Sequence, residues 1–220
     1  MSLDTAILIP SYNSNPRLQK LINQIKDQHE HQIIVVDDGS PEPVELEHND
    51  ISLIQNESNR GKGLSLKRGF DFARQKGFSH VVTMDSDLQH DPLELATFLD
   101  SNSDLDFVLG YRERNKDMPI LRKFSNWITS RIISKLTGVD VLDSQCGYRR
   151  YSLEAIDEIE FTETGFQFES EVLIKGLHAE SKIEQVKIST IYDKDNKSYI
   201  KHFSDTIKFI QLILRSILRK

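Results

Sequence analysis

The chain has 220 residues, of which 38% are hydrophobic and 28% are charged, and its formal net charge is −6. This length suffices for one α/β domain with a core of its own, and the composition is that of an ordinary globular protein. The acidic balance argues against a nucleic-acid partner, because domains that bind DNA or RNA are usually basic.

The sequence shows no pattern typical of export or membrane insertion. Cys146 is the single cysteine, so no intrachain disulfide can form, which fits a reducing cytoplasm. The first residues lack the basic and apolar regions of a signal peptide, and no apolar run reaches the roughly 18 residues of a spanning helix. We therefore expect the protein in the cytoplasm.

Short apolar runs alternate with helical patterns in the first half of the chain. Strands are predicted at 6–10, 32–36, 51–54, 81–84 and 106–110. Helices are predicted between them, at 18–25, at 64–76 and at 91–99, the last with Asp91 as N-cap. This alternation predicts an α/β fold with a mostly parallel sheet covered on both faces, whose ligands bind beyond the carboxyl ends of the strands.

The second half has a more mixed pattern. Helices are predicted at 121–136, 166–177 and 203–220, and a strand at 183–188. Polar segments are expected as loops at 143–149 and 193–198. Because no repeat, low-complexity tract or linker interrupts the chain, we expect a single domain over residues 1–220, with 203–220 as an amphipathic C-terminal helix.

Two acidic turns follow predicted strands. Asp85-Ser86-Asp87 comes after the strand at 81–84, and Asp37-Asp38 comes after the strand at 32–36. Paired carboxylates suit Mg²⁺ or Mn²⁺, which prefer oxygen ligands and share them with substrate phosphates, and a carboxylate after a strand can also bind a ribose. Either turn alone has a structural explanation, since Asp and Gly are favoured in turns. Because Pro10 ends a third strand at the same edge, we expect all three segments in one crevice.

Cations accompany these carboxylates. The turn Asn59-Arg60-Gly61-Lys62-Gly63 opens the helix at 64–76, where free N–H groups and the helix dipole attract phosphate. Its spacing is not that of a P-loop, and the structural alternative is a glycine turn with solvated charges. Arginines can neutralise a departing diphosphate, although charge runs are usually solvated faces. The basic residues after the strand at 106–110 are Arg112, Arg114, Arg122, Lys123 and Arg131, and Arg149 is a similar candidate.

Two further features have open interpretations. Glu169 and Glu171 lie near the start of a predicted helix, where negative charge is favoured, and the functional alternative is that one of them faces a substrate. The helix at 203–220 has a wide apolar stripe and a basic face. Core packing explains such a stripe, and the alternative is a helix on an anionic membrane surface.

Together these motifs resemble the inverting family 2 glycosyltransferases with a GT-A fold. The resemblance rests on Ile9-Pro10-Ser11-Tyr12-Asn13, Val35-Val36-Asp37-Asp38-Gly39-Ser40, Asn59-Arg60-Gly61-Lys62-Gly63 and Met84-Asp85-Ser86-Asp87-Leu88-Gln89-His90-Asp91-Pro92. Three more segments, Gly110-Tyr111-Arg112, Asp143-Ser144-Gln145-Cys146-Gly147-Tyr148-Arg149 and Phe168-Glu169-Ser170-Glu171, are similar to the branch of dolichyl-phosphate mannose and glucose synthases and their bacterial polyprenyl-phosphate relatives.

The resemblance implies roles at the matching positions. A metal, Mg²⁺ or Mn²⁺, is expected on Asp85 and Asp87 with help from Gln89, and Arg112 is expected at a donor or acceptor phosphate. Asp143 and Arg149 are expected on the sugar and acceptor side, and Glu171 matches a glutamate of the family. The expected contacts to the nucleotide sugar are Pro10, Tyr12, Asn13, Val36, Asp37, Asp38, Lys62 and Ser86, and Lys194 is carried over from a basic pair of the family.

The chain also departs from the family pattern. Ser14 stands where many members carry Glu, and Gln185-Val186-Lys187 replaces a Glu-Val-Pro strand. The later basic pair is replaced by the segment 193–199, and the C-terminal spanning helices of many relatives are absent. These departures concern the donor's identity and the mode of membrane attachment rather than the fold.

The resemblance implies an inverting transfer of a hexose from a nucleotide-diphosphate sugar, of the UDP-glucose or GDP-mannose class. The expected acceptor is a polyprenyl phosphate, which needs no strong base, with peripheral contact between the C-terminal helix and the inner face of the cytoplasmic membrane. A hydroxyl acceptor on a glycan is the alternative and requires a base, for which Asp143 and then Glu171 are candidates. A nucleotidyltransferase would usually show a glycine- and arginine-rich loop where Ser11-Tyr12-Asn13-Ser14-Asn15 stands.

Overall fold

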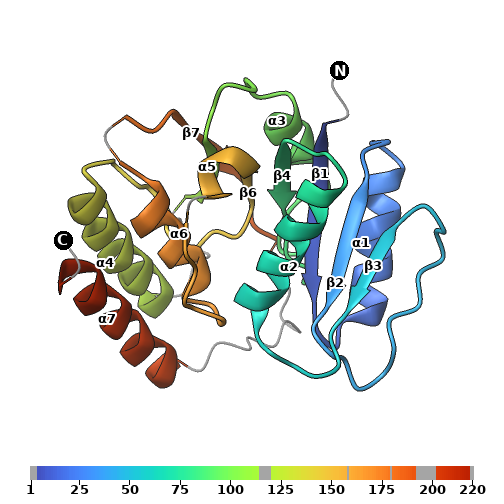
Figure 1. Cartoon of the computed structure of the whole chain (residues 1–220), viewed down its shortest axis with the longest axis horizontal. Helices are drawn as coiled ribbons and strands as arrows, with labels where there is room; N and C mark the ends of the chain where they lie inside the picture. The colour runs from blue at the N-terminus through green and yellow to red at the C-terminus, as the bar shows by residue number, and fades with distance from the viewer. Residues whose placement is uncertain (1–3, 114–119, 158, 179, 192–201, 219–220) are drawn as a thin grey trace.

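The structure is a computed structural model that describes residues 4–113, 120–157, 159–178, 180–191 and 202–218. In this part of the chain a seven-stranded sheet runs in the order β3-β2-β1-β4-β6-β5-β7 (Figure 1). The strands are β1 (Thr5–Ser11), β2 (Ile33–Asp37), β3 (Ser52–Gln55), β4 (His80–Thr83), β5 (Phe107–Arg112), β6 (Arg149–Ser152) and β7 (Ile183–Ile188). The helices are α1 (Asn15–Lys26), α2 (Lys62–Gln75), the 3₁₀ turn η1 (Pro92–Glu94), α3 (Leu95–Leu99), α4 (Ile120–Thr137), α5 (Leu153–Asp157), α6 (Phe168–Gly176) and α7 (His202–Leu218).

The predicted mostly parallel sheet is confirmed, with one antiparallel strand that the sequence did not reveal. Strand β6 pairs antiparallel with both β4 and β5, and every other pairing is parallel. The loop expected at 143–149 ends where β6 begins, and no strand was predicted at 149–152. Arg149 is fully buried and donates to the carbonyls of Ser144 (2.7 Å) and Glu169 (3.0 Å), so main-chain oxygens compensate for a charge inside the sheet.

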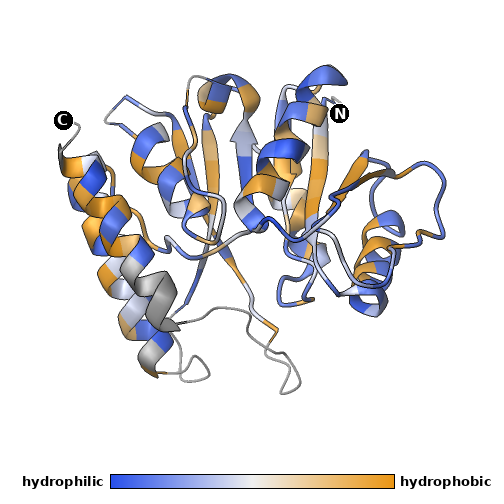
Figure 2. Cartoon of the chain, turned by 60° about the horizontal axis from the view of Figure 1, so that its bottom comes forward, coloured by the Kyte–Doolittle hydropathy of each residue, from blue (hydrophilic) through white to orange (hydrophobic). Residues whose placement is uncertain are grey.

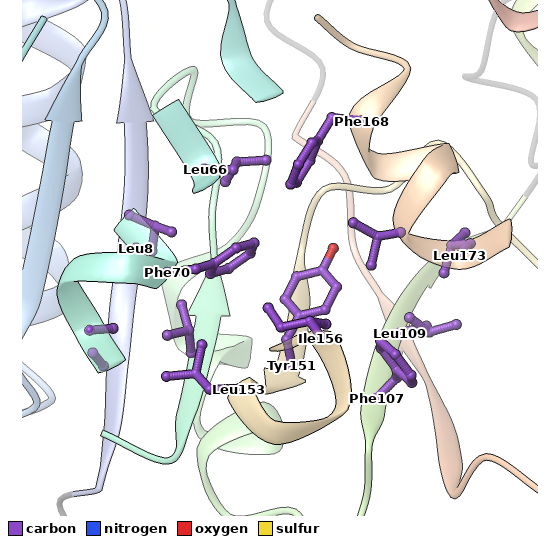
Figure 3. Close-up of a cluster of buried hydrophobic side chains, with 14 of the residues drawn as sticks. Leu8, Leu66, Phe70, Phe107, Leu109, Tyr151, Leu153, Ile156, Phe168 and Leu173 are labelled. Atoms are coloured by element: carbon purple, nitrogen blue, oxygen red, sulfur yellow. The ribbon is translucent and has the colours of Figure 1, made fainter. Parts of the chain in front are cut away.

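The side chains of β1 alternate between the two faces of the sheet, as expected for a strand. Leu8 packs against Leu66 and Phe70 of α2 in one buried cluster, whereas Ile7 belongs to a second cluster with Leu18 of α1. The first cluster continues through aromatic side chains, since the Phe70 and Tyr151 rings lie 5.4 Å apart at a steep angle (Figure 3). Helices α1 and α3 therefore cover one face, and α2, α5 and α6 cover the other.

The register of the parallel strands brings the acidic turns together. Ser11, at the end of β1, pairs with Asp37 at the end of β2, and on its other side β1 pairs with β4 up to Thr83. Asp85 and Asp87 follow β4 directly. The convergence expected from the sequence is therefore produced by strand pairing.

Helices α4, α6 and α7 lie together at one end of the molecule (Figure 1). Leu212 of α7 is buried and Phe209 packs against the core, whereas Ile210, Leu214 and Ile217 are each about half exposed. The C-terminal helix, which carries both apolar and polar patches in Figure 2, thus packs on the core and also leaves an apolar row uncovered. Within the described residues, every helix falls short of the length and apolarity that a bilayer crossing demands.

Candidate functional site

Asp85 and Asp87 occupy the loop after β4, at the carboxyl edge of the sheet. The Asp85 side chain is 29% exposed, and Asp87 accepts a hydrogen bond from the Gln89 N–H at 3.0 Å. Burial and the negative charge of Asp85 both raise the pKa of the Asp87 carboxyl above its ordinary value. Two carboxylates that repel each other beside an accessible edge are suited to share a cation.

Lys62 joins this pair to a third carboxylate. Its ammonium nitrogen lies 2.6 Å from Asp85 Oδ1 and 3.0 Å from Glu169 Oε1. Burial alone would lower the pKa of Lys62, but the charges of Asp85 and Glu169 raise it well above its ordinary value. Burial would likewise raise the pKa of Asp85, whereas Lys62 holds it below the ordinary value. Both groups therefore stay charged over the physiological range.

The main chain passes close over this cluster at Gly147. A Cβ on Gly147 would lie 2.8 Å from Glu169 Oε1, 3.0 Å from Asp85 Oδ2 and 3.1 Å from Lys62 Nζ. A side chain there would shift the ends of these three charged side chains, so the glycine leaves room for their present arrangement.

The glycine turn before α2 is organised by Asp38. This buried carboxylate accepts the N–H groups of Arg60 (3.0 Å) and Gly61 (2.7 Å) and the Asn56 side-chain amide (2.7 Å). Gly61 has a φ of +100°, and a Cβ there would lie 2.5 Å from the Thr164 carbonyl oxygen. Asp38 thus fixes the turn that presents Lys62.

The other residues expected at the nucleotide differ in exposure. Pro10 and Val36 are register partners near the carboxyl ends of β1 and β2. Both side chains are buried, so a ligand at this edge would meet their main chain. Tyr12 is half-buried and Asn13 is exposed with a φ of +51°, its N–H donating to Ser40 at 2.7 Å.

Two hydroxyl-bearing turns support this edge. Asp37 accepts hydrogen bonds from the Ser40 N–H (3.2 Å) and hydroxyl (2.5 Å). Ser14 has its hydroxyl 2.8 Å from that of Ser11 and donates to Ser86 at 3.0 Å. Ser14 therefore links the β1 loop to the acidic loop after β4.

Arg112 ends β5 and is held by Asp143. The guanidinium donates from Nε (2.7 Å) and from a terminal nitrogen (3.0 Å) to the two carboxylate oxygens, and the Arg112 N–H adds a third bond at 3.2 Å. The positive charge of Arg112 contributes to lowering the pKa of Asp85, which places the guanidinium in the field of the acidic loop. This bidentate geometry fixes the direction of the arginine.

Asp143 is itself enclosed. Besides Arg112, it accepts from the Asn126 side chain of α4 (2.7 Å) and from the Gln145 N–H (3.0 Å), and its side chain is 1% exposed. Burial would raise its pKa, but Arg112 keeps the pKa below its ordinary value. A carboxylate of this kind orients Arg112 and is a weak proton acceptor, so the structure gives little support to Asp143 as a general base.

The structure separates Glu169 from Glu171. Glu169 contacts Lys62, whereas the buried Glu171 carboxylate accepts from the Thr162 N–H and hydroxyl and from Lys175 at 2.6 Å. Residues two apart on a helix point in nearly opposite directions, so only one of the two can face the acidic loop. The two-residue spacing could have shown from the sequence that Glu169 and Glu171 face different surroundings. In the structure, Glu171 does not contact the described cluster around Asp85.

Arg149, Gln89 and His90 complete the surroundings. The buried guanidinium of Arg149 donates to backbone carbonyls, so it supports the loop at 143–149 from inside the protein rather than lining its surface. Gln89 lies beside the acidic pair, its carbonyl accepting from the Ile191 N–H at 3.0 Å. His90, which sequence reasoning did not single out, is buried with Nε2 3.9 Å from Asp85 Oδ2. Lys194 lies outside the described residues.

The donor set fits a divalent metal shared with a substrate. In the described part of the chain no three His, Cys, Asp or Glu side chains form a metal cluster. Asp85 and Asp87 could hold such a metal with two carboxylates, and diphosphate oxygens would complete the shell, as is usual for Mg²⁺.

A mostly parallel sheet whose carboxyl edge carries paired carboxylates, a lysine and a fixed arginine defines a protein that binds phosphorylated ligands and is suited to transferring groups from them. The profile described as Glycosyl transferase family 2 matches residues 6–159, and the chain belongs to this family. It is a glycosyltransferase.

Two curated relatives and one solved structure place it further. The chain is 30% identical over 213 residues to the UDP-N-acetylglucosamine–dolichyl-phosphate N-acetylglucosaminyltransferase of Methanococcus voltae, covering 84% of this chain and 85% of that protein. It is 26% identical over 199 residues to the undecaprenyl-phosphate mannosyltransferase of Micrococcus luteus, covering 84% and 82%. Glucosyl-3-phosphoglycerate synthase of Mycobacterium tuberculosis, solved with Mn²⁺, UDP-glucose and phosphoglyceric acid, superposes with a TM-score of 0.74 at 20% identity, over 96% of this chain and 79% of that one. This likeness confirms the expected GT-A fold.

Proposed function

We propose that this enzyme transfers a hexose, with inversion, from a nucleotide-diphosphate sugar of the UDP-glucose or GDP-mannose class to a polyprenyl phosphate. The observation that carries the proposal is the meeting of Asp85, Asp87, Lys62 and Arg112 at one strand edge, with both signs of charge held in fixed positions. Relatives named for dolichyl-phosphate and undecaprenyl-phosphate acceptors support the acceptor class.

The charged groups divide the work of the transfer. Asp85 and Asp87 would hold Mg²⁺ or Mn²⁺, which would supply positive charge at the donor diphosphate. Lys62 and Arg112 supply fixed positive charge where negative charge develops on the leaving group, and no reorganisation is needed because their carboxylate partners already orient them. The turn fixed by Asp38 presents Lys62 at the start of α2.

The state of the carboxylates favours a phosphate acceptor over a hydroxyl acceptor. Asp143 is bonded to Arg112 with its pKa lowered, and Glu171 is bonded to Lys175 and Thr162 away from the acidic loop. Neither is suited to remove a proton from a hydroxyl, whereas a polyprenyl phosphate is already anionic and attacks without a strong base. A hydroxyl acceptor on a glycan is the second candidate, with Glu169, whose Oε1 lies 3.0 Å from Lys62 Nζ, as the carboxylate to test as a base.

A lipid-linked acceptor places the reaction at a membrane. We assign the contact to α7, which exposes the apolar row of Ile210, Leu214 and Ile217 and carries basic Lys208 and Arg215 on another side, and the site of action to the inner face of the cytoplasmic membrane. We also propose that residues 1–220 act as a single catalytic domain.

The test is thermal unfolding with UDP, GDP or CDP, each with Mn²⁺ or with EDTA. Binding to the native state raises the unfolding temperature by mass action. We expect a rise with one nucleotide that requires Mn²⁺, which would also choose the base of the donor. No rise with any nucleotide would contradict the donor site, and an equal rise in EDTA would contradict the role of Asp85 and Asp87 as metal ligands.

A further inference from the structure

Helix α4 carries an apolar row that nothing in the described part of the protein covers. Ile120, Phe124 and Trp127 are 81%, 60% and 49% exposed, at the spacing that places them on one side of a helix. The Phe124 and Trp127 rings stack with centroids 6.3 Å apart. Of the ten exposed large apolar side chains in the described residues, six lie on α4 and α7.

The charges of α4 have one sign. Its charged residues are Arg122, Lys123, Arg131 and Lys135, and it holds no acidic residue, although the whole chain has a formal charge of −6. Arg131 and Lys135 are exposed and continue the row of Trp127 toward the end of the helix. An aromatic row followed by cations on one helix side matches an anionic bilayer surface, where rings lie at headgroup depth and cations meet the lipid charge.

The opposite side of α4 reaches the candidate site. Asn126, next to Trp127, donates to Asp143 at 2.7 Å, and Asp143 holds the guanidinium of Arg112. Ser130 donates to the Ser144 hydroxyl at 3.2 Å. Helix α4 therefore has its buried side bonded to the loop that orients Arg112, and its opposite side is exposed and can meet an external surface.

We infer that the outward row of α4, Ile120, Phe124, Trp127, Arg131 and Lys135, docks on an anionic lipid bilayer. Leu136 of α4 and Leu212 of α7 line one shared pocket, so the two helices are neighbours through sides that lie away from their exposed rows. The inference extends the proposed lipid-linked acceptor, on which it rests for its place in the reaction. Docking through α4 would hold the loop that orients Arg112 about one helix diameter from the bilayer surface, where a polyprenyl phosphate presents its charge.

Trp127 provides a direct test because it is the single tryptophan of the chain. The unmodified protein is mixed with vesicles of phosphatidylcholine alone or with phosphatidylglycerol, all without polyprenyl phosphate, and tryptophan emission is recorded together with flotation. We expect a blue shift and quenching by brominated lipid with anionic vesicles, both reduced by salt. Flotation without any change in Trp127 emission would overturn the inference and leave α7 as the contact.

Variants separate the apolar and charged contributions. Phe124→Gln with Ile120→Gln should weaken vesicle binding about tenfold or more, since large apolar side chains would no longer leave water. Arg131→Gln and Lys135→Gln should weaken it about fivefold each. Leu93→Gln, which removes an exposed apolar side chain of η1 (68% exposed), is the matched control and should bind as the wild type. Binding of the α4 variants at wild-type strength would contradict the inference.

Two controls keep the outcomes distinct. Each variant should keep the wild-type unfolding temperature and the nucleotide-dependent rise described above, so a failure of the proposed donor site appears separately from a failure to bind vesicles. The α4 row could instead bind a second copy of the chain. In that case the blue shift would appear without vesicles as the protein concentration rises, and sedimentation would show dimers. That result would overturn the inference.

Discussion

The two halves of the sheet hold their carboxylates in different ways. At the edge of β1, β2 and β4, Asp85 is 29% exposed and Asp87 has its pKa raised by burial and by the charge of its neighbour. In the half formed by β5, β6 and α6, Asp143 and Glu171 are enclosed and each accepts several hydrogen bonds. The first half leaves negative charge for a ligand to neutralise, and the second neutralises its own charge to position other groups.

The largest effect should follow from Asp87→Asn. We expect transfer to fall by about a thousandfold or more, because charge stabilisation of the leaving group depends on this edge. The fold should persist, since the native state already disfavours the charged form of Asp87. Sugar transfer and thermal unfolding measured on the same preparation check this prediction. Near-normal turnover would contradict the role of Asp87 as a metal ligand.

Asp143→Ala should instead damage the fold. It leaves the Arg112 guanidinium, 9% exposed, without its buried partner, which typically costs about 3 kcal/mol. Urea unfolding measures the loss. The matched control is Lys187→Gln, which removes an ion pair with Glu113 whose side chains are more than half exposed and should leave the midpoint unchanged. An unchanged midpoint for Asp143→Ala would contradict the contrast between the two halves.

Glu169 and Glu171 allow a carboxylate at the candidate site to be compared with an enclosed one within the same helix, α6. Glu169→Gln should lower turnover about tenfold, because the amide weakens the hold on Lys62. Glu171→Gln should lower the unfolding temperature while leaving turnover per folded molecule nearly unchanged, since its partners are Thr162 and Lys175. The reverse pattern would return Glu171 to the role that the family resemblance implies.

The smallest effect concerns pH. Burial lowers the pKa of His90 to about 4, so the unfolded chain takes up a proton near pH 6.5 that the native protein refuses. The His90 contribution to stability is therefore complete above about pH 6.5 and declines between about pH 6.5 and 4, at a limit of about 1.4 kcal/mol per pH unit. His90→Phe should flatten this decline in urea titrations at several pH values, and an identical slope would contradict the assignment.

The strands that the sequence predicted carry apolar runs or alternating apolar residues, and β7, Ile183–Ile188, has the predicted bounds. Asp91 caps η1 by accepting the Leu93 N–H at 3.0 Å, as expected. Strand β6 was missed because its arginines are compensated by carbonyls distant in sequence, which no local pattern shows. The predicted helix at 91–99 is divided into η1 and α3.

The site was predictable to the extent that strand ends define it. The meeting of Pro10, Asp37 and Asp85 follows from the edge rule for parallel sheets. The enclosure of Asp143 and Glu171 depends on contacts between residues of separate helices and loops, such as the bond from Asn126 to Asp143. These pairings arise from tertiary packing, so the roles of Asp143 and Arg149 as supports of the site could not be seen in the sequence.

The position of β6 has a consequence for how the chain is made. This strand lies between β4 and β5 and pairs with both, yet it leaves the ribosome after them. A nascent chain that ends before residue 149 lacks the strand that joins the two parts of the sheet, and the apolar β4 then has an open edge that can pair with other chains. The risk of aggregation is therefore concentrated in one interval of synthesis, and shortened chains that end before β6 should depend on chaperones far more than the full-length protein does.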